Sequence, residues 1–266
     1  MLGVSASGYD AWRSRPLSRR QSQDATLLTE IRRVHERSRQ TYGRLRIHAE
    51  LRAQGQRWNH KRIERWMRVH RLRARRARRG RRPTEGLLGL PIAPNRLNHE
   101  FRASGPNQIW TADITYLDTA EGWLYLATVL DLCSRRLVGW AMAEHLETSL
   151  VRDALQMALT QRQPAAGRLP HSDRGRQYAS AEYQALLAAH GMQCRRSRRG
   201  NCYDNAVHES FFGTLKSECA DTRFPNRTAA RQSVFEYIEV WYNRQRRHST
   251  LGYLSPAEFE QIRALS

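Results

Sequence analysis

The chain has 266 residues, of which 40% are hydrophobic, and it carries a formal net charge of +20 at pH 7. This length is enough for one sizeable core and a smaller module. No apolar run approaches the roughly 18–20 residues of a transmembrane helix, and the first residues lack the sustained apolar core of a signal peptide. We therefore expect a soluble, intracellular protein.

The positive charge is concentrated in the first 100 residues, which hold 25 Lys and Arg against 8 Asp and Glu, compared with 20 against 17 in the rest. Such a field favours nucleic acid as the partner, because each neutralised phosphate releases counterions. A membrane surface fits less well, since no strongly amphipathic membrane helix accompanies the charge. The four cysteines form no CxxC pair, which argues against a zinc site and predicts buried free thiols.

Residues 1–24 form a basic N-terminal segment, most of which we expect to be only partly ordered. Apolar residues then recur at helical spacing and predict helices over residues 25–38, 44–54 and 60–70. Three short helices with tight turns are typical of a helix-turn-helix module, whose third helix would read a DNA groove. Four basic residues should point outward from that helix: Lys61, Arg62, Arg65 and Arg68. The alternative is a basic helical hairpin that touches only the DNA backbone.

A dense cationic run, RLRARRARRGRR, occupies residues 71–82 and completes this first domain, which we place at residues 25–82. The run is either a linker that follows DNA phosphates or a disordered tail. Its expected DNA contacts are Arg75, Arg76, Arg78 and Arg79. Pro and Gly punctuate residues 83–106 with little periodicity, which predicts an interdomain linker there.

The second half has the pattern of an α/β domain. Strands are predicted over residues 109–117, 123–132 and 136–143, which form a meander; the second is nearly all apolar, as a buried central strand would be. Trp110 is expected in the core. The remaining predictions are a helix over 149–161, a short strand ending near His171, a helix over 181–190, a strand over 192–195, a helix capped by Asp204, a long helix over 228–242 and a short helix begun at Ser255 and Pro256.

Three acids stand in unusual settings within this pattern. Asp113 lies inside the first strand, Asp173 just after the short fourth strand, and Glu209 on the helix that follows Asp204, with Val207, Phe211 and Leu215 as its apolar stripe. A lone Glu on a helix is ordinarily a solvated surface residue. Carboxylates from separate elements that converge on one point are, however, what a pair of hard divalent cations requires.

Six strings along the chain, in this order, resemble the transposases of the insertion-sequence-three group (second reading frame), which carry a retroviral-integrase catalytic core. They cover nearly the whole chain from about residue 25. The strings are TYGRLRIHAEL with NHKRIERWMR, NQIWTADITYL, GWLYLATVLDLCSRRLVGW, HSDRGRQYAS, GNCYDNAVHESFFGTLKSE and WYNRQRRHSTLGYLSPAEFE. The group has 35 residues between its last two catalytic acids, and 35 separate Asp173 from Glu209 here.

The resemblance implies a ribonuclease-H-like, five-stranded mixed sheet flanked by helices over residues 107–220, with a C-terminal helical extension over 221–266. It implies that Asp113, Asp173 and Glu209 are both the catalytic acids and the ligands of two Mg²⁺ ions, with Mn²⁺ as a substitute. The implied activity is metal-dependent DNA strand cleavage and strand transfer. The implied partners are double-stranded DNA (element ends and target), further copies of the chain on DNA, and a first-frame protein or frameshift fusion, all in the bacterial cytoplasm with the nucleoid.

Further residues near the acids are candidates for contacts with substrate DNA. Arg196, Arg198 and Arg199 form a basic loop, and Lys216 either grips a terminal phosphate or is an ordinary exposed lysine. The chain departs from the group at Arg176, where Ser is usual, and at His208, where Ala is frequent. Two other functions remain open: a catalytically silent DNA-binding regulator of the element, and a ribonuclease-H-like metal nuclease.

Overall fold

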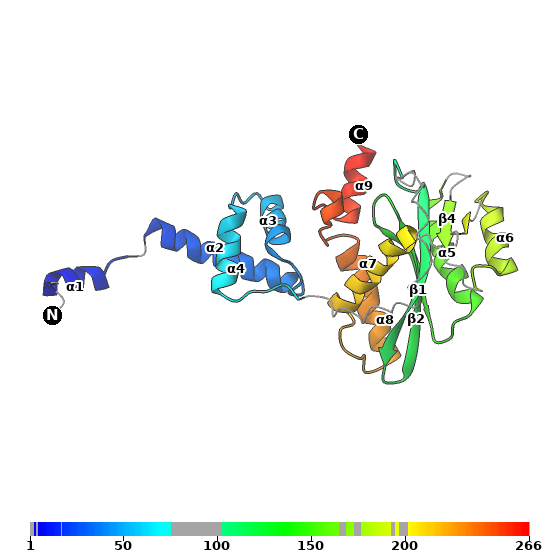
Figure 1. Cartoon of the computed structure of the whole chain (residues 1–266), viewed down its shortest axis with the longest axis horizontal. Helices are drawn as coiled ribbons and strands as arrows, with labels where there is room; N and C mark the ends of the chain where they lie inside the picture. Colours follow the sequence, from blue (N-terminus) through cyan, green and yellow to red (C-terminus); the bar gives the residue numbers. More distant parts are fainter. Residues whose placement is uncertain are drawn as a thin grey trace, which may run out of the picture. The chain divides into compact units, whose positions relative to one another are not determined.

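The computed structural model describes residues 3, 5–16, 18–75, 103–164, 169–172, 177–192, 195–196 and 202–265, and only the backbone of 169–172, 195–196 and 202–206 (Figure 1). The chain divides into two compact units, Met1–Arg75 and Arg76–Ser266. None of the helices in the described ranges is both long and apolar enough to span a bilayer.

The first unit is entirely helical, with α1 (Ala6–Arg13), α2 (Arg19–Arg37), α3 (Arg44–Ala53) and α4 (His60–Val69). The bounds predicted for α3 and α4 are confirmed to within one residue. The expectation of partial order at the start of the chain is wrong for α1, which is a regular helix although it buries no residue. Helix α2 begins well before the predicted residue 25, because Ser18 and Gln21 form a reciprocal capping box.

The second unit contains a five-stranded sheet in the order β3-β2-β1-β4-β5. Strands β1 (Ile109–Thr119), β2 (Gly122–Asp131) and β3 (Leu137–Ala143) form the predicted antiparallel meander. Strands β4 (Leu169–Ser172) and β5 (Arg195–Arg196) extend it in parallel beyond β1. The expected mixed sheet is therefore confirmed, with β1 at its centre.

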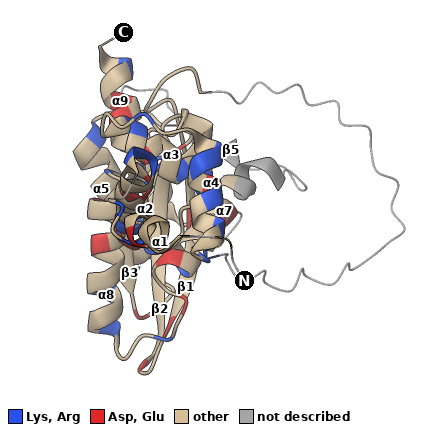
Figure 2. Ribbon diagram, turned by 90° about the vertical axis from the view of Figure 1, so that its left-hand side faces the viewer, with Lys and Arg blue, Asp and Glu red and all other residues tan. Residues whose placement is uncertain are grey.

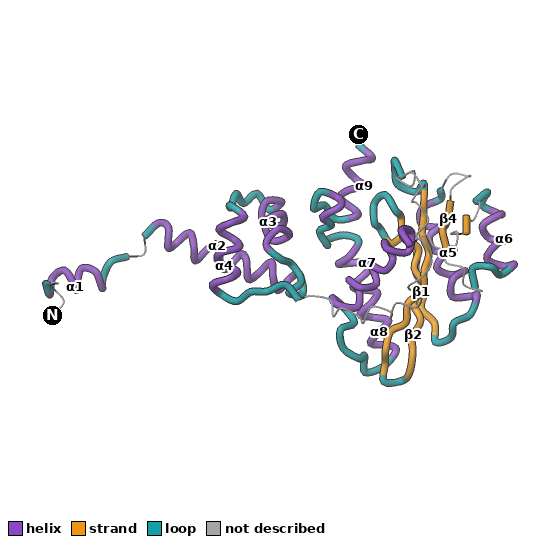
Figure 3. Tube along the Cα trace, viewed as in Figure 1, coloured by secondary structure: helices purple, strands orange, loops and turns teal. Residues whose placement is uncertain are grey.

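Helices cover both faces of this sheet, which Figure 3 shows as an orange layer between purple helices. On one face, α5 (Thr148–Arg162) and α6 (Ala181–Ala189) close the main core, in which Trp110 is buried as predicted. Gly139 on β3 permits the close approach of α5: a Cβ there would lie 2.2 Å from the carbonyl oxygen of Ala154 and 2.7 Å from the Cβ of Ala158.

Helices α7 (Cys202–Glu218) and α8 (Arg227–Phe235) lie on the other face (Figure 1). Helix α8 continues directly into the π-helix η1 (Glu236–Tyr242). Phe211 and Leu215 of the predicted α7 stripe are buried. The prediction that Asp204 caps this helix is wrong, because α7 already begins at Cys202. The 3₁₀ turn η2 (Ser249–Leu251) and helix α9 (Pro256–Ala264) end the fold, and Ser255 caps α9 in a capping box with Glu258.

A buried ion pair joins the end of α7 to the segment after η1. The Glu218 carboxylate accepts hydrogen bonds from Nε and Nη2 of Arg246 at 2.8–3.0 Å, from the Tyr237 hydroxyl at 3.1 Å and from the Trp241 indole at 3.2 Å. We call these four residues the Glu218 cluster. Burial alone would lower the pKa of Arg246, but the adjacent Glu218 carboxylate raises it, so the guanidinium stays charged.

Side chains of the C-terminal extension also bind the outer edge of the sheet. Asn243 accepts a hydrogen bond from the backbone N–H of Leu137 and donates one to its carbonyl, both at 3.0 Å. Arg231 donates to the carbonyl of Met142 at 2.7 Å. The extension is thus held to both ends of β3. Of the cysteines whose side chains the structure describes, Cys133 and Cys219 are half-buried thiols outside any disulfide.

Candidate catalytic and DNA-binding sites

Asp113 lies in the middle of the central strand β1. Its Oδ1 accepts a hydrogen bond from the backbone N–H of Ile114 at 2.8 Å, and the residue is half-buried. Its cross-strand partner on β2 is Thr128. Directly opposed residues of an antiparallel pair project from the same face, so Asp113 and Thr128 share one face of the sheet.

Helix α7 is tied to this position by His208. The His208 side chain is buried, and its ring interacts with the backbone of Thr128. Burial lowers the pKa of His208 to about 3, so the imidazole is neutral at physiological pH. Glu209 is the next residue of α7 and is exposed. The turn of α7 that carries Glu209 therefore begins beside Thr128, the β2 residue that lies opposite Asp113.

The strand that leads toward the second predicted acid ends at the same place. Strand β4 runs parallel to β1, and its last residue, Ser172, pairs with Ala112, which precedes Asp113. Asp173 itself lies outside the described residues, as does Arg176. Among the described residues, no group of three His, Cys, Asp or Glu side chains is arranged to hold a metal ion.

Lys216 is not an ordinary exposed lysine. Its Nζ lies 4.8 Å from the centre of the Tyr116 ring, and partial burial lowers its pKa. Tyr116 in turn packs edge-on against Trp123, with ring centres 5.0 Å apart. Tyr116 was not among the predicted residues, and it is the side chain that partly covers Lys216.

The basic residues predicted on the groove-reading helix fall into two classes. The ribbon of α4 carries several blue basic segments in Figure 2, and Lys61, Arg65 and Arg68 are exposed as expected. Arg62 does not point freely outward. It is half-buried, forms an ion pair with Asp24 at 2.7 Å and lies over the Trp58 ring at 5.1 Å. The hydrogen bond from Arg62 lowers the pKa of Asp24.

The other predicted DNA contacts lie mostly beyond the described side chains. Arg75 is exposed, and its backbone N–H donates to the carbonyl of Gln40 at 2.7 Å. Only the backbone of Arg196 is described, in β5. Arg76, Arg78, Arg79, Arg198 and Arg199 lie outside the described residues.

Comparisons with protein families place known domains over both units. Residues 22–80 match an HTH-like domain, and residues 103–202 match an integrase core domain. A second integrase core model matches residues 190–256. The helical unit and the sheet unit thus each correspond to a recognised domain type.

Two relatives are similar over almost the full chain. An uncharacterized 31 kDa protein of insertion element IS600 from Shigella sonnei is 45% identical over 262 residues, covering 98% of this chain and 96% of its own. Transposase InsF for insertion sequence IS3A from Escherichia coli (strain K12) is 46% identical over 263 residues, covering 98% of this chain and 91% of its own.

A likeness to a solved structure is consistent with the fold. The match is to a chain in the cryo-EM structure of the simian T-cell lymphotropic virus intasome in complex with PP2A regulatory subunit B56 gamma. It has a TM-score of 0.50 and 18% identity, and covers 60% of this chain and 56% of the other. Near-complete coverage by an IS3 transposase, together with the integrase core match, shows that the chain belongs to the IS3 family of DNA transposases.

Proposed function

We propose that this transposase cleaves and joins DNA strands through Asp113, Asp173 and Glu209, which together hold two Mg²⁺ ions. The observation that carries the proposal is the contact between His208 and Thr128. This contact supports a position beside Thr128 for the α7 turn that carries Glu209, and Thr128 lies opposite Asp113 on the neighbouring strand. Strand β4, which precedes Asp173, ends next to the same part of β1. These positions support a shared site for Asp113 and Glu209, and the proposal adds Asp173, which lies outside the described residues.

The chemistry of the donor set fits these ions. Carboxylate oxygens are the hard ligands that Mg²⁺ prefers, and Mn²⁺ accepts the same ligands. When bound, the ions supply charge neutralisation at the phosphate and a more acidic attacking hydroxyl. The chain itself supplies position: the Ile114 N–H orients the Asp113 carboxylate on a rigid central strand, and the neutral His208 fixes α7 without adding charge beside Glu209.

DNA binding divides between the units in this proposal. Residues 25–82 dock the element end, with Lys61, Arg65 and Arg68 toward the groove and the run from Arg75 to Arg79 along the backbone. Residues 107–220 form the catalytic core, where Arg196, Arg198 and Arg199 contact the substrate strand and Lys216 binds a phosphate near the reacting bond. Residues 83–106 link the two, and residues 221–266 brace the core.

The working assembly is proposed to contain more than one copy of the chain on DNA in the bacterial cytoplasm, at the nucleoid. Each copy would hold its own pair of ions. A first-frame protein or a frameshift fusion would add further recognition of the element ends. Sedimentation of the chain with and without a duplex that carries the element end measures the copy number.

The test is cleavage and joining of an oligonucleotide duplex carrying the element's end, in Mg²⁺ and in Mn²⁺. Asp113→Asn and Glu209→Gln are expected to lose about 10²–10³-fold or more in rate, the scale of removing one group that stabilises the transition state. The matched control is Glu147→Gln, because Glu147 is an exposed acid whose side chain makes no capping bond to α5. Asp113→Asn activity equal to that of the parent would disprove the site. A parent that binds DNA but never joins it would be a silent regulator.

A further inference from the structure

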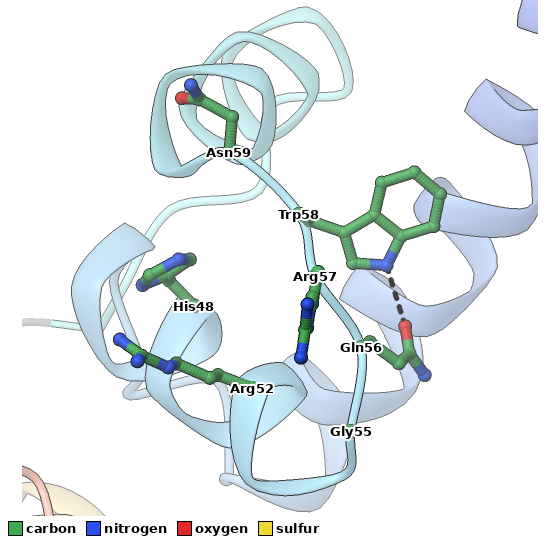
Figure 4. Close-up of a pocket in the computed structure, with 7 residues that line it drawn as sticks. All are labelled: His48, Arg52, Gly55, Gln56, Arg57, Trp58 and Asn59. Carbon is green, nitrogen blue, oxygen red and sulfur yellow. Dashed lines mark hydrogen bonds between the residues drawn. The ribbon is translucent and has the colours of Figure 1, made fainter.

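A polar cavity of about 670 Å³ opens between α3 and α4 in the helical unit. Figure 4 shows His48 and Arg52 projecting from α3 one helical turn apart, Arg57 rising from the turn, and Asn59 at the start of α4. We call this cavity the α3–α4 pocket. None of the residues predicted to contact DNA lines it.

The charges of this pocket are unbalanced within the described residues. Its lining contains two arginines and a histidine but no acid. The side chains of Arg52 and Arg57 are exposed and make no hydrogen bond or ion pair with any described residue. Like charges held together in a concave site repel one another unless an anion joins them.

Other arginines of the same unit are neutralised by acids. Arg33 pairs with Glu30 at 2.6 Å, and Arg62 pairs with Asp24 at 2.7 Å. Arg44 pairs with Glu64 at 2.5 Å. Acids of this unit therefore form ion pairs with Arg33, Arg44 and Arg62. No described acid pairs with Arg52 or Arg57 of the pocket.

The turn that carries Arg57 is braced from behind. The Trp58 indole donates a hydrogen bond to the Gln56 side chain at 2.7 Å (Figure 4). Asn59 accepts a hydrogen bond from the N–H of Lys61 at 2.8 Å and so caps α4. The first bond joins the two residues that flank Arg57 and the second holds the start of α4, so both limit the freedom of the turn that carries Arg57.

We propose that the α3–α4 pocket binds a phosphodiester group of the DNA backbone through Arg52, Arg57 and His48. The inference rests on the proposed role of the helical unit in DNA binding, and names the contact that positions it. Guanidinium groups present paired donors that match phosphate oxygens. Such a contact sets the register of the unit on the duplex without reading bases, which leaves Lys61, Arg65 and Arg68 of α4 for the groove.

The experiment measures the affinity of the full chain for a duplex with the element end and for a scrambled duplex, over a series of KCl concentrations. The test variant is Arg52→Gln/Arg57→Gln, and the control is Arg33→Gln/Arg44→Gln, which removes the same net charge from ion-paired positions. We expect the test variant to lose about tenfold or more in affinity on both duplexes. The slope of log affinity against log salt should fall by about 0.9, the value for one lost phosphate contact.

Equal affinities and slopes for the test and control variants would overturn the inference, and so would a loss confined to the element end, because that loss indicates base reading. A parent that binds neither duplex would remove the DNA-binding role itself, which is a separate failure. The helical circular dichroism signal of each variant is recorded first. If the double variant has lost it, Arg52→Gln and Arg57→Gln are measured singly, and each should lower the slope by up to about 0.9, since both arginines bind the same phosphate.

Discussion

Replacing Arg246 by methionine should strongly destabilise the sheet unit. The substitution leaves the Glu218 carboxylate buried, with only the Tyr237 hydroxyl and the Trp241 indole as donors. The side chains of Arg246 and Glu218 are 5% and 3% exposed, so water cannot replace the lost partner. Removing one member of a buried ion pair costs about 3–5 kcal/mol, which is a large share of the roughly 5–15 kcal/mol that stabilises a typical domain.

The double variant Glu218→Gln/Arg246→Met separates the pair from its surroundings. Glutamine keeps an acceptor for Tyr237 and Trp241, and methionine replaces the arginine stem, so no buried charge remains. We expect the double variant to cost less than either single variant, with a coupling free energy of about 2–3 kcal/mol.

The assay is urea unfolding of the full chain at pH 7, followed by tryptophan fluorescence and circular dichroism. Arg152→Met serves as the control, because Arg152 pairs with Asp153 on the surface at 46% and 56% exposure. That variant should lose less than about 1 kcal/mol. If Arg246→Met costs no more than Arg152→Met, the Glu218 cluster does not stabilise the fold as described.

Four further predictions concern α7 and the sheet. Glu209→Gln should bind the element-end duplex as tightly as the parent or more tightly in fluorescence anisotropy, since it removes a negative charge near DNA; loss of folding instead would indicate a structural glutamate. Gly139→Ala should cost about 1–3 kcal/mol or more in urea unfolding, because its Cβ would overlap Ala154 and Ala158. Gly213→Ala, where a Cβ meets nothing within 4 Å, should instead add about 0.5–1 kcal/mol. His208 has a pKa of about 3 when folded and about 6.5 when unfolded. The stabilisation that the neutral imidazole gives the folded state is therefore complete above pH 6.5. As the pH falls to 5, the free energy of unfolding decreases by about 2 kcal/mol, because only the unfolded state takes up the proton. His208→Ala should lack this share of the acid destabilisation in unfolding measured at pH 7.5 and pH 5; an unchanged pH profile would contradict the buried, neutral imidazole.

The sequence was most informative where local patterns decide the structure. The alternation and apolar runs of the first three strands placed β1 to β3 to within two residues, because a central sheet buries its residues regularly. Two helix starts were misplaced. The Ser18–Gln21 capping box extended α2 toward the N-terminus, and Asp204, a residue type favoured at caps, proved to lie inside α7.

Contacts between distant residues could not be read from local patterns. Arg62 was expected to face DNA, but Asp24, which lies 38 positions earlier in the chain, holds it against α2. Glu218 and Arg246 look like ordinary surface charges in the sequence and are among the most buried charged residues described. The three proposed catalytic acids stay a prediction from spacing and resemblance, supported by the position of β1, β4 and α7.

The amide of Asn243 does for Leu137 what a neighbouring strand would do, since it supplies one acceptor and one donor to the same residue. Arg231 occupies the carbonyl of Met142 near the far end of β3. Free strand edges are where chains add to one another's sheets. With both ends of this edge bound by the chain's own side chains, a strand from another molecule would have to displace Asn243 and Arg231 before it could lengthen the sheet at β3.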